Sequence, residues 1–180
     1  MKINLKILTY IISVLIISSC SQKVYFNTQV RKQLEDLNIP LNKLQFYVDR
    51  DVILRREISK EETKASSGVV KFENGKYVNI IKLPMYTYGL CTKIYPNKLN
   101  ISFEDVDGKF LTFGYPKNGS DENAYQINAD EWNGNIGKIN YEGKVFYIDE
   151  KSSDAKIMIN QQWKAKKDVK QRVMKGRKIK

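Results

Sequence analysis

The chain has 180 residues, of which 31 are Lys or Arg, 20 are Asp or Glu and none is His, so its formal net charge is +11. This length suits one domain, and hydrophobic and aromatic fractions of 42% and 11% can build a core. The lack of histidine excludes a Ser-His-Asp triad, a Cys-His pair and a histidine-ligated zinc site, and two cysteines cannot form a four-cysteine zinc site. We expect no cofactor and no metal.

The first residues are organised like an export signal. Lys2 and Lys6 give a charged start, an apolar run covers residues 7–17, and small residues follow. This order is typical of a secretory signal peptide. The apolar run has 11 residues, whereas a membrane-spanning helix needs roughly 20, so a permanent span is not expected.

The segment Ile17-Ser18-Ser19-Cys20 resembles the lipobox of bacterial lipoproteins. The resemblance implies that residues 1–19 are a signal peptide and that Cys20 is acylated, which anchors the protein to a membrane of the cell envelope. Ser21, rather than Asp, follows, which in enterobacteria implies sorting to the outer membrane; whether the protein faces the periplasm or the surface stays open. Once Cys20 is lipidated, Cys91 has no disulfide partner and is expected to be a small buried hydrophobic residue.

The mature chain is predicted to begin with a lipidated tether at residues 20–27, followed by a β-rich domain at residues 28–163. The domain opens with a short helix, for which Thr28 is the expected N-cap. The helix repeats apolar residues on one face and ends before Pro40. This face consists of Val30, Leu34 and Leu37.

From residue 44 onward the apolar pattern changes to a period of two, which is typical of strands. Three turn pairs, Asn74-Gly75, Asp107-Gly108 and Glu142-Gly143, separate candidate strands. The pattern predicts a mainly β fold, a single antiparallel β-barrel or sandwich of about ten short strands. The candidate strands lie at 44–48, 52–58, 68–72, 77–83, 99–103, 110–113, 125–128, 136–141, 144–148 and 157–163.

Residues 164–180 form a basic C-terminal tail with nine basic residues and one acidic residue. We expect it to be flexible or partly helical and to attract an acidic protein partner or an acidic envelope polymer. Export to the envelope argues against nucleic acid, and a solvated tail with no partner is the alternative. The basic residues are Lys164, Lys166, Lys167, Lys170, Arg172, Lys175, Arg177, Lys178 and Lys180.

Aromatic residues in predicted loops are the candidate binding residues. They are Tyr86, Tyr88 and Trp132. Aromatic rings on loops stack on sugars or fill protein interfaces, and they are also ordinary core or edge residues of β-domains.

Acidic residues offer two weaker possibilities. Paired carboxylates cleave glycosides when held about 5–10 Å apart, and a carboxylate-only hydrolase would draw on Asp121, Glu122, Asp130 and Glu131. Residues 103–108 partly resemble a calcium loop, but a phenylalanine replaces one oxygen ligand, so a turn explains them better. We expect no enzymatic activity.

These features favour a membrane-anchored, non-catalytic envelope lipoprotein. Residues 45–56 and 102–114 resemble paired motifs of small uncharacterised envelope lipoproteins, which carry no assigned role. The expected function is that of an interaction or assembly subunit in a secretion, motility or surface-assembly complex. The alternative is a β-barrel lipoprotein that binds a small ligand or a glycan.

Overall fold

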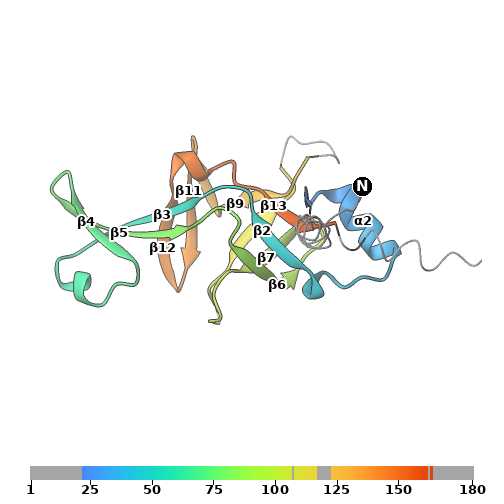
Figure 1. Cartoon of the computed structure of the whole chain (residues 1–180). Coiled ribbons are helices and arrows are strands. Elements are labelled where there is room, and N and C mark those ends of the chain that lie inside the picture. Colours follow the sequence, from blue (N-terminus) through green and yellow to red (C-terminus); the bar gives the residue numbers. More distant parts are fainter. Residues whose placement is uncertain (1–21, 107, 117–122, 162, 164–180) are drawn as a thin grey trace, which may run out of the picture.

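The computed structural model describes residues 22–106, 108–116, 123–161 and 163. In this part of the chain the fold is mainly β, with thirteen strands in two antiparallel sheets, one α-helix and three short 3-10 helices (Figure 1). Neither sheet closes on itself among these residues, so the barrel is not confirmed, and a sandwich-like arrangement is compatible with the two sheets.

The seven-stranded sheet begins with the strand nearest the N-terminus and continues through strands from the whole chain. Its strands are, in spatial order, β1 (Lys23–Tyr25), β13 (Ile157–Asn160), β2 (Gln45–Val48), β6 (Tyr88–Ile94), β7 (Lys98–Ser102), β8 (Leu111–Gly114) and β9 (Gln126–Asn128).

The six-stranded sheet joins the consecutive strands β10, β11 and β12 to β3 and to the β4–β5 hairpin. Its strands are, in spatial order, β10 (Glu131–Asn133), β11 (Ile136–Tyr141), β12 (Lys144–Ile148), β3 (Val52–Ile58), β5 (Lys76–Leu83) and β4 (Val69–Glu73). The 3-10 helices are η1 (Leu41–Lys43), η2 (Glu61–Lys64) and η3 (Glu150–Ser152). The β4–β5 hairpin and α2 lie at opposite ends of the molecule (Figure 1).

Two predicted hairpin turns are confirmed. Asn74 and Gly75 have φ values of 51° and 80°, and Glu142 and Gly143 have values of 57° and 73°. Two consecutive positive φ values are the requirement of a type I′ turn. Each of the ten predicted runs contains a strand, and the structure adds β1, β6 and β10.

Helix α2 (Thr28–Asp36) lies where the sequence predicts it, but its cap differs from the expectation. Asn27, not Thr28, is the N-cap: its backbone is extended and its Oδ1 accepts a hydrogen bond of 2.8 Å from the Val30 amide. Thr28 is already helical. Leu34 is fully buried, which confirms the expected apolar face.

The core joins the inner faces of both sheets to α2. At its centre, the Phe26 ring meets the rings of Phe46 and Tyr125 edge-on, at centroid distances of 5.3 and 5.0 Å. Phe146 and Ile148 of β12 extend the same cluster into the six-stranded sheet. Helix α2 and the core therefore cover one face of the seven-stranded sheet.

No helix among the described residues is both long and apolar enough to span a membrane.

Candidate functional site

Tyrosines gather on the face of the seven-stranded sheet that points away from the core. Tyr25 of β1 pairs with Met158 of β13, Met158 pairs with Tyr47 of β2, and Tyr47 pairs with Tyr88 of β6. Directly paired residues in antiparallel strands share a face. The row therefore places three tyrosines, with Met158 between the first two, on one face over four strands, a width of about 14 Å.

Tyr86 joins this row from the turn before β6. Its φ of 64° lies in the left-handed region that L-residues rarely adopt, and its amide donates a 2.8 Å hydrogen bond to the carbonyl of Val48. The Lys23 Nζ lies 4.7 Å from the centroid of the Tyr47 ring and 5.2 Å from that of Tyr86. We call Tyr25, Tyr47, Tyr86 and Tyr88 the tyrosine face.

Three residues of the tyrosine face, Tyr25, Tyr86 and Tyr88, are exposed, and Tyr47 is half-buried. Tyr88 is 69% exposed, and Met158 is buried within the row. The hydroxyl of Tyr25 donates to Asp49 at 3.4 Å. Partial burial, followed by the negative charge of Asp49, raises the pKa of Tyr25, so its hydroxyl stays neutral at neutral pH.

Trp132, the third predicted binding residue, lies apart from the tyrosines. It belongs to β10 of the six-stranded sheet and pairs directly with Gly137. A Cβ atom at Gly137 would lie 2.9 Å from Cζ3 of the indole, so the ring packs against the glycine backbone. This contact gives Trp132 a structural role in the β10–β11 hairpin.

The period-two pattern of the sequence does not predict strand β6, because its large side chains face solvent and its small ones face the core. Small residues, Gly89 and Cys91, point to the core, while Tyr88 and Leu90 point outward. A Cβ atom at Gly89 would lie 2.7 Å from Cγ2 of Ile101, so only glycine lets β6 approach β7 this closely. An alternation of large and small residues was the sequence feature that could have identified this strand.

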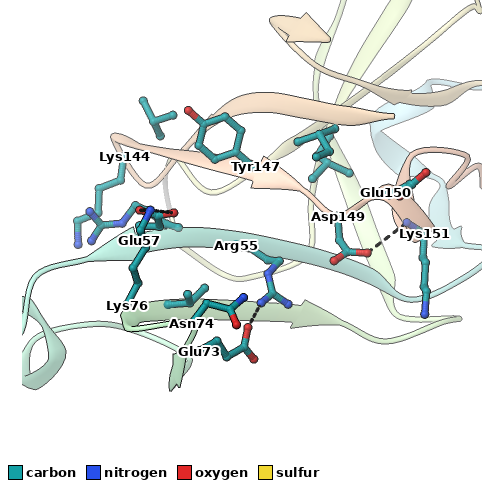
Figure 2. A pocket seen from close by; sticks show the side chains of 15 residues that line it. Arg55, Glu57, Glu73, Asn74, Lys76, Lys144, Tyr147, Asp149, Glu150 and Lys151 are labelled. Carbon is teal, nitrogen blue, oxygen red and sulfur yellow. Dashed lines mark hydrogen bonds and ion pairs between the residues drawn. The ribbon is translucent and has the colours of Figure 1, made fainter. Parts of the chain in front are cut away.

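A second concave surface lies in the six-stranded sheet, between β12 and β3 (Figure 2). These strands pair only at Tyr147–Arg55 and Ile148–Leu54, although both continue toward residues 144 and 58. The space where pairing stops is a groove of about 1250 Å³. We call it the β3–β12 groove; nothing in the sequence pattern predicts it.

The two walls of the groove differ in chemistry. Exposed apolar side chains of β11 and β12, together with Lys144, line one side, and an ion pair from Arg55 to Glu73 and another from Lys76 to Glu57 at 2.8 Å form the other (Figure 2). Val78 of β5, which is buried, also lines the groove. The apolar residues are Ile136, Val145 and Tyr147.

A polar cluster links the β7–β8 loop to the β11–β12 turn. Lys109 Nζ lies 2.8 Å from both Glu104 Oε2 and Glu142 Oε1, and the Tyr141 hydroxyl donates to Glu104 at 2.8 Å. Burial opposes ionisation of Glu142, but hydrogen bonds from Lys109 and Ser67 outweigh it and lower its pKa. Glu142 therefore holds no proton for acid catalysis at neutral pH, and the cluster acts as a clamp.

The structure describes two of the four acidic residues of the hydrolase hypothesis. Glu131 pairs with Lys138 at 3.1 Å and Asp130 is exposed. Asp121 and Glu122 lie outside the described residues. Within that same part of the chain, no three acidic or cysteine side chains are grouped to hold a metal.

Cys91 is buried, as expected, and burial raises the pKa of its thiol to about 11. Such a thiol is almost entirely protonated at neutral pH and is a poor nucleophile.

Cys20 and the nine basic residues of the tail lie outside the described residues. Strand β1 falls within residues 20–27, so part of the expected tether belongs to the sheet.

Comparison of the chain with models of protein families, with curated proteins and with solved structures finds no match.

Proposed function

We propose that this chain is a membrane-anchored, non-catalytic lipoprotein of the bacterial envelope that binds a partner protein through the β3–β12 groove. The observation that carries the binding role is the groove itself, in which apolar side chains stay exposed beside charged ones. A concave surface that exposes apolar side chains beside polar ones suits protein recognition. The lipobox resemblance supports the anchor.

The groove suits an extended segment of a partner protein. Arg56 and Glu57 of β3 and Lys144 and Val145 of β12 line the groove where these two strands no longer pair with each other. An extended peptide gains main-chain hydrogen bonds at such strand edges, and its side chains fill pockets alternately. Tyr147 and Val145 would contact apolar side chains of the peptide, and the ion pairs of the other wall would contact its polar side chains.

The proposed partner is a component of an envelope complex for secretion, motility or surface assembly. The basic tail would strengthen the association by contacting acidic groups of that partner or of an envelope polymer. Deletion of residues 164–180 is then expected to weaken, but not abolish, partner recovery.

The test is crosslinking of the full chain in intact cells, followed by identification of the captured proteins. Val145→Glu replaces an apolar side chain of the groove by a carboxylate and should reduce capture. Val106→Glu is the matched control, because Val106 lies outside the groove and its side chain is 53% exposed, close to the 43% of Val145. Equal capture by both variants would contradict binding at the groove, and capture of glycan alone would favour the glycan-binding alternative.

Anchoring has its own test. Cys20→Ser is expected to release the protein from the membrane fraction, and the mass of the wild-type mature protein should include the acyl chains. A wild-type protein without acyl mass would contradict the lipoprotein assignment.

A further inference from the structure

We propose that the tyrosine face is a membrane-docking surface, which rests on the headgroup region of the same bilayer that holds the acyl chains of Cys20. This inference depends on the lipid anchor proposed above. It adds which face of the domain meets the lipid and therefore how the domain is oriented.

The position of the anchor limits how far the domain can lie from the lipid. Lys23 is the first residue of β1 and comes three residues after Cys20. Three extended residues span at most about 11 Å. Lys23 also contacts the rings of Tyr47 and Tyr86. The acylated Cys20 therefore lies within about two strand spacings, roughly 10 Å, of the tyrosine face.

The other face of the sheet is not free to meet the lipid at this point. Val24, between the outward residues Lys23 and Tyr25, packs against the core, and Phe26 is fully buried. Helix α2 follows and buries Leu34 against the same core. The exposed side of the sheet next to the anchor is therefore the tyrosine face.

The side chains of this face suit the interface between lipid and water. Tyrosine has an apolar ring and a polar hydroxyl, and it is enriched at this depth in membrane proteins. Leu90, also exposed on β6, adds apolar area beside Tyr88. The strained Tyr86 extends the same surface beyond the strand row.

The charge of the face suits anionic headgroups. The four strands that carry the tyrosine row, with sequences KVY, IMIN, QFYV and YGLCTKI, contain two lysines and no acidic residue. The nearby carboxylate of Asp49 is 5% exposed and accepts a 2.7 Å hydrogen bond from the Lys156 amide. Asp51, whose side chain is 43% exposed, accepts a 2.7 Å hydrogen bond from the Met85 amide next to Tyr86, but it pairs with Lys82 at 2.6 Å. An anionic bilayer would therefore meet Lys23, while the exposed carboxylate that contacts the residue before Tyr86 is neutralised by a lysine.

The test is hydroxyl-radical footprinting of the lipidated protein in phosphatidylethanolamine–phosphatidylglycerol vesicles. Tyr88 and Tyr147 are 69% and 45% exposed, so in the free domain Tyr88 should be oxidised faster. Docking reverses this order: Tyr88 becomes at least about threefold slower than Tyr147, because the bilayer covers its ring. Oxidation of Tyr88 that stays faster than that of Tyr147 would overturn the proposal.

A charge variant separates docking from simple proximity to the vesicle. Tyr88→Glu should raise the oxidation of Tyr86 by weakening contact with anionic lipid, whereas Tyr147→Glu should leave it unchanged. An equal effect of the two variants would also overturn docking. The acyl mass at Cys20 is measured on the same samples: its absence refutes the anchor, while acylated protein with an unprotected Tyr88 refutes only the docking surface.

Discussion

Replacing Tyr86 by glycine and by alanine separates the strain at this residue from the contacts of its ring. An L-residue in the left-handed region loses roughly 1–2 kcal/mol, and Tyr86 has a φ of 64°. Glycine avoids this strain but loses about 0.5–1 kcal/mol in additional chain entropy. Both variants also lose the contact with Lys23, worth about 0.5–1 kcal/mol at an exposed site.

The two variants should therefore differ by a measurable amount. Tyr86→Gly is expected to lie within about 1 kcal/mol of the wild type, since relief of strain offsets the two losses. Tyr86→Ala keeps the strain and should be less stable than Tyr86→Gly by about 0.5–1 kcal/mol. Urea denaturation of the full chain, followed by tryptophan fluorescence, measures both free energies of unfolding.

Tyr88 provides the matched control, since it lies on the same face but in an extended strand. There glycine should be less stable than alanine by about 0.5–1 kcal/mol, so the order of the two variants inverts between the positions. If glycine is no more stable than alanine at Tyr86, the backbone there is not strained, and the reasoning from its φ fails.

Three further outcomes follow from the fold. Gly89→Ala should lower the free energy of unfolding by about 1–3 kcal/mol, because the new methyl group would collide with Ile101; an unchanged denaturation midpoint would refute the close approach of β6 and β7. Cys91 should resist a thiol reagent at pH 8 in the folded protein and react on unfolding, since its pKa is raised to about 11; rapid labelling of native protein would contradict this. The pKa of Glu142 in the folded protein is below its ordinary 4.5. Its ionised form therefore stabilises the folded protein above pH 4.5, and this stabilisation is lost as the pH falls through the folded pKa. Lys109→Met should flatten this dependence, and acid titrations that coincide for both proteins would exclude the clamp.

Most strands were predictable because their hydrophobic residues face the core. In β3, Val52, Leu54 and Ile58 are buried, and the period-two pattern gives its limits as 52–58, as the structure has them. The hairpins were predictable for a second reason: Asn74-Gly75 and Glu142-Gly143 adopt positive φ values that few other pairs accept.

The cap of α2 shows a local limit of the same approach. Asn27 and Thr28 both have side chains that can cap a helix, so the sequence does not show which of them is the N-cap. Asn27 also forms a bridge with Ala124, nearly a hundred residues along the chain, which fixes its extended backbone. A tertiary contact therefore selects the cap.

The candidate sites were only partly predictable. Tyr86 and Tyr88 stood out as aromatics near turn residues, but Tyr25 and Tyr47 join them only through the register β1–β13–β2–β6. The groove depends on where pairing between β12 and β3 stops, and no residue pattern encodes the end of pairing between strands so far apart in sequence.

Strand β6, whose large side chains face solvent, was not predicted from the sequence, and the same arrangement bears on the proposed role of the tyrosine face. A strand whose apolar residues face outward looks like a loop when apolar residues are assumed to mark the core. In β6, Gly89 faces inward because its neighbours leave no space for a side chain, and this frees Tyr88 and Leu90 to face outward. Exposed apolar side chains that gather on one face, as Tyr88 and Leu90 do with Tyr25 and Tyr86, are typical of contact surfaces. If Cys20 is acylated as proposed, the surface that this face would contact is the lipid bilayer, because the anchor would hold it close to β1.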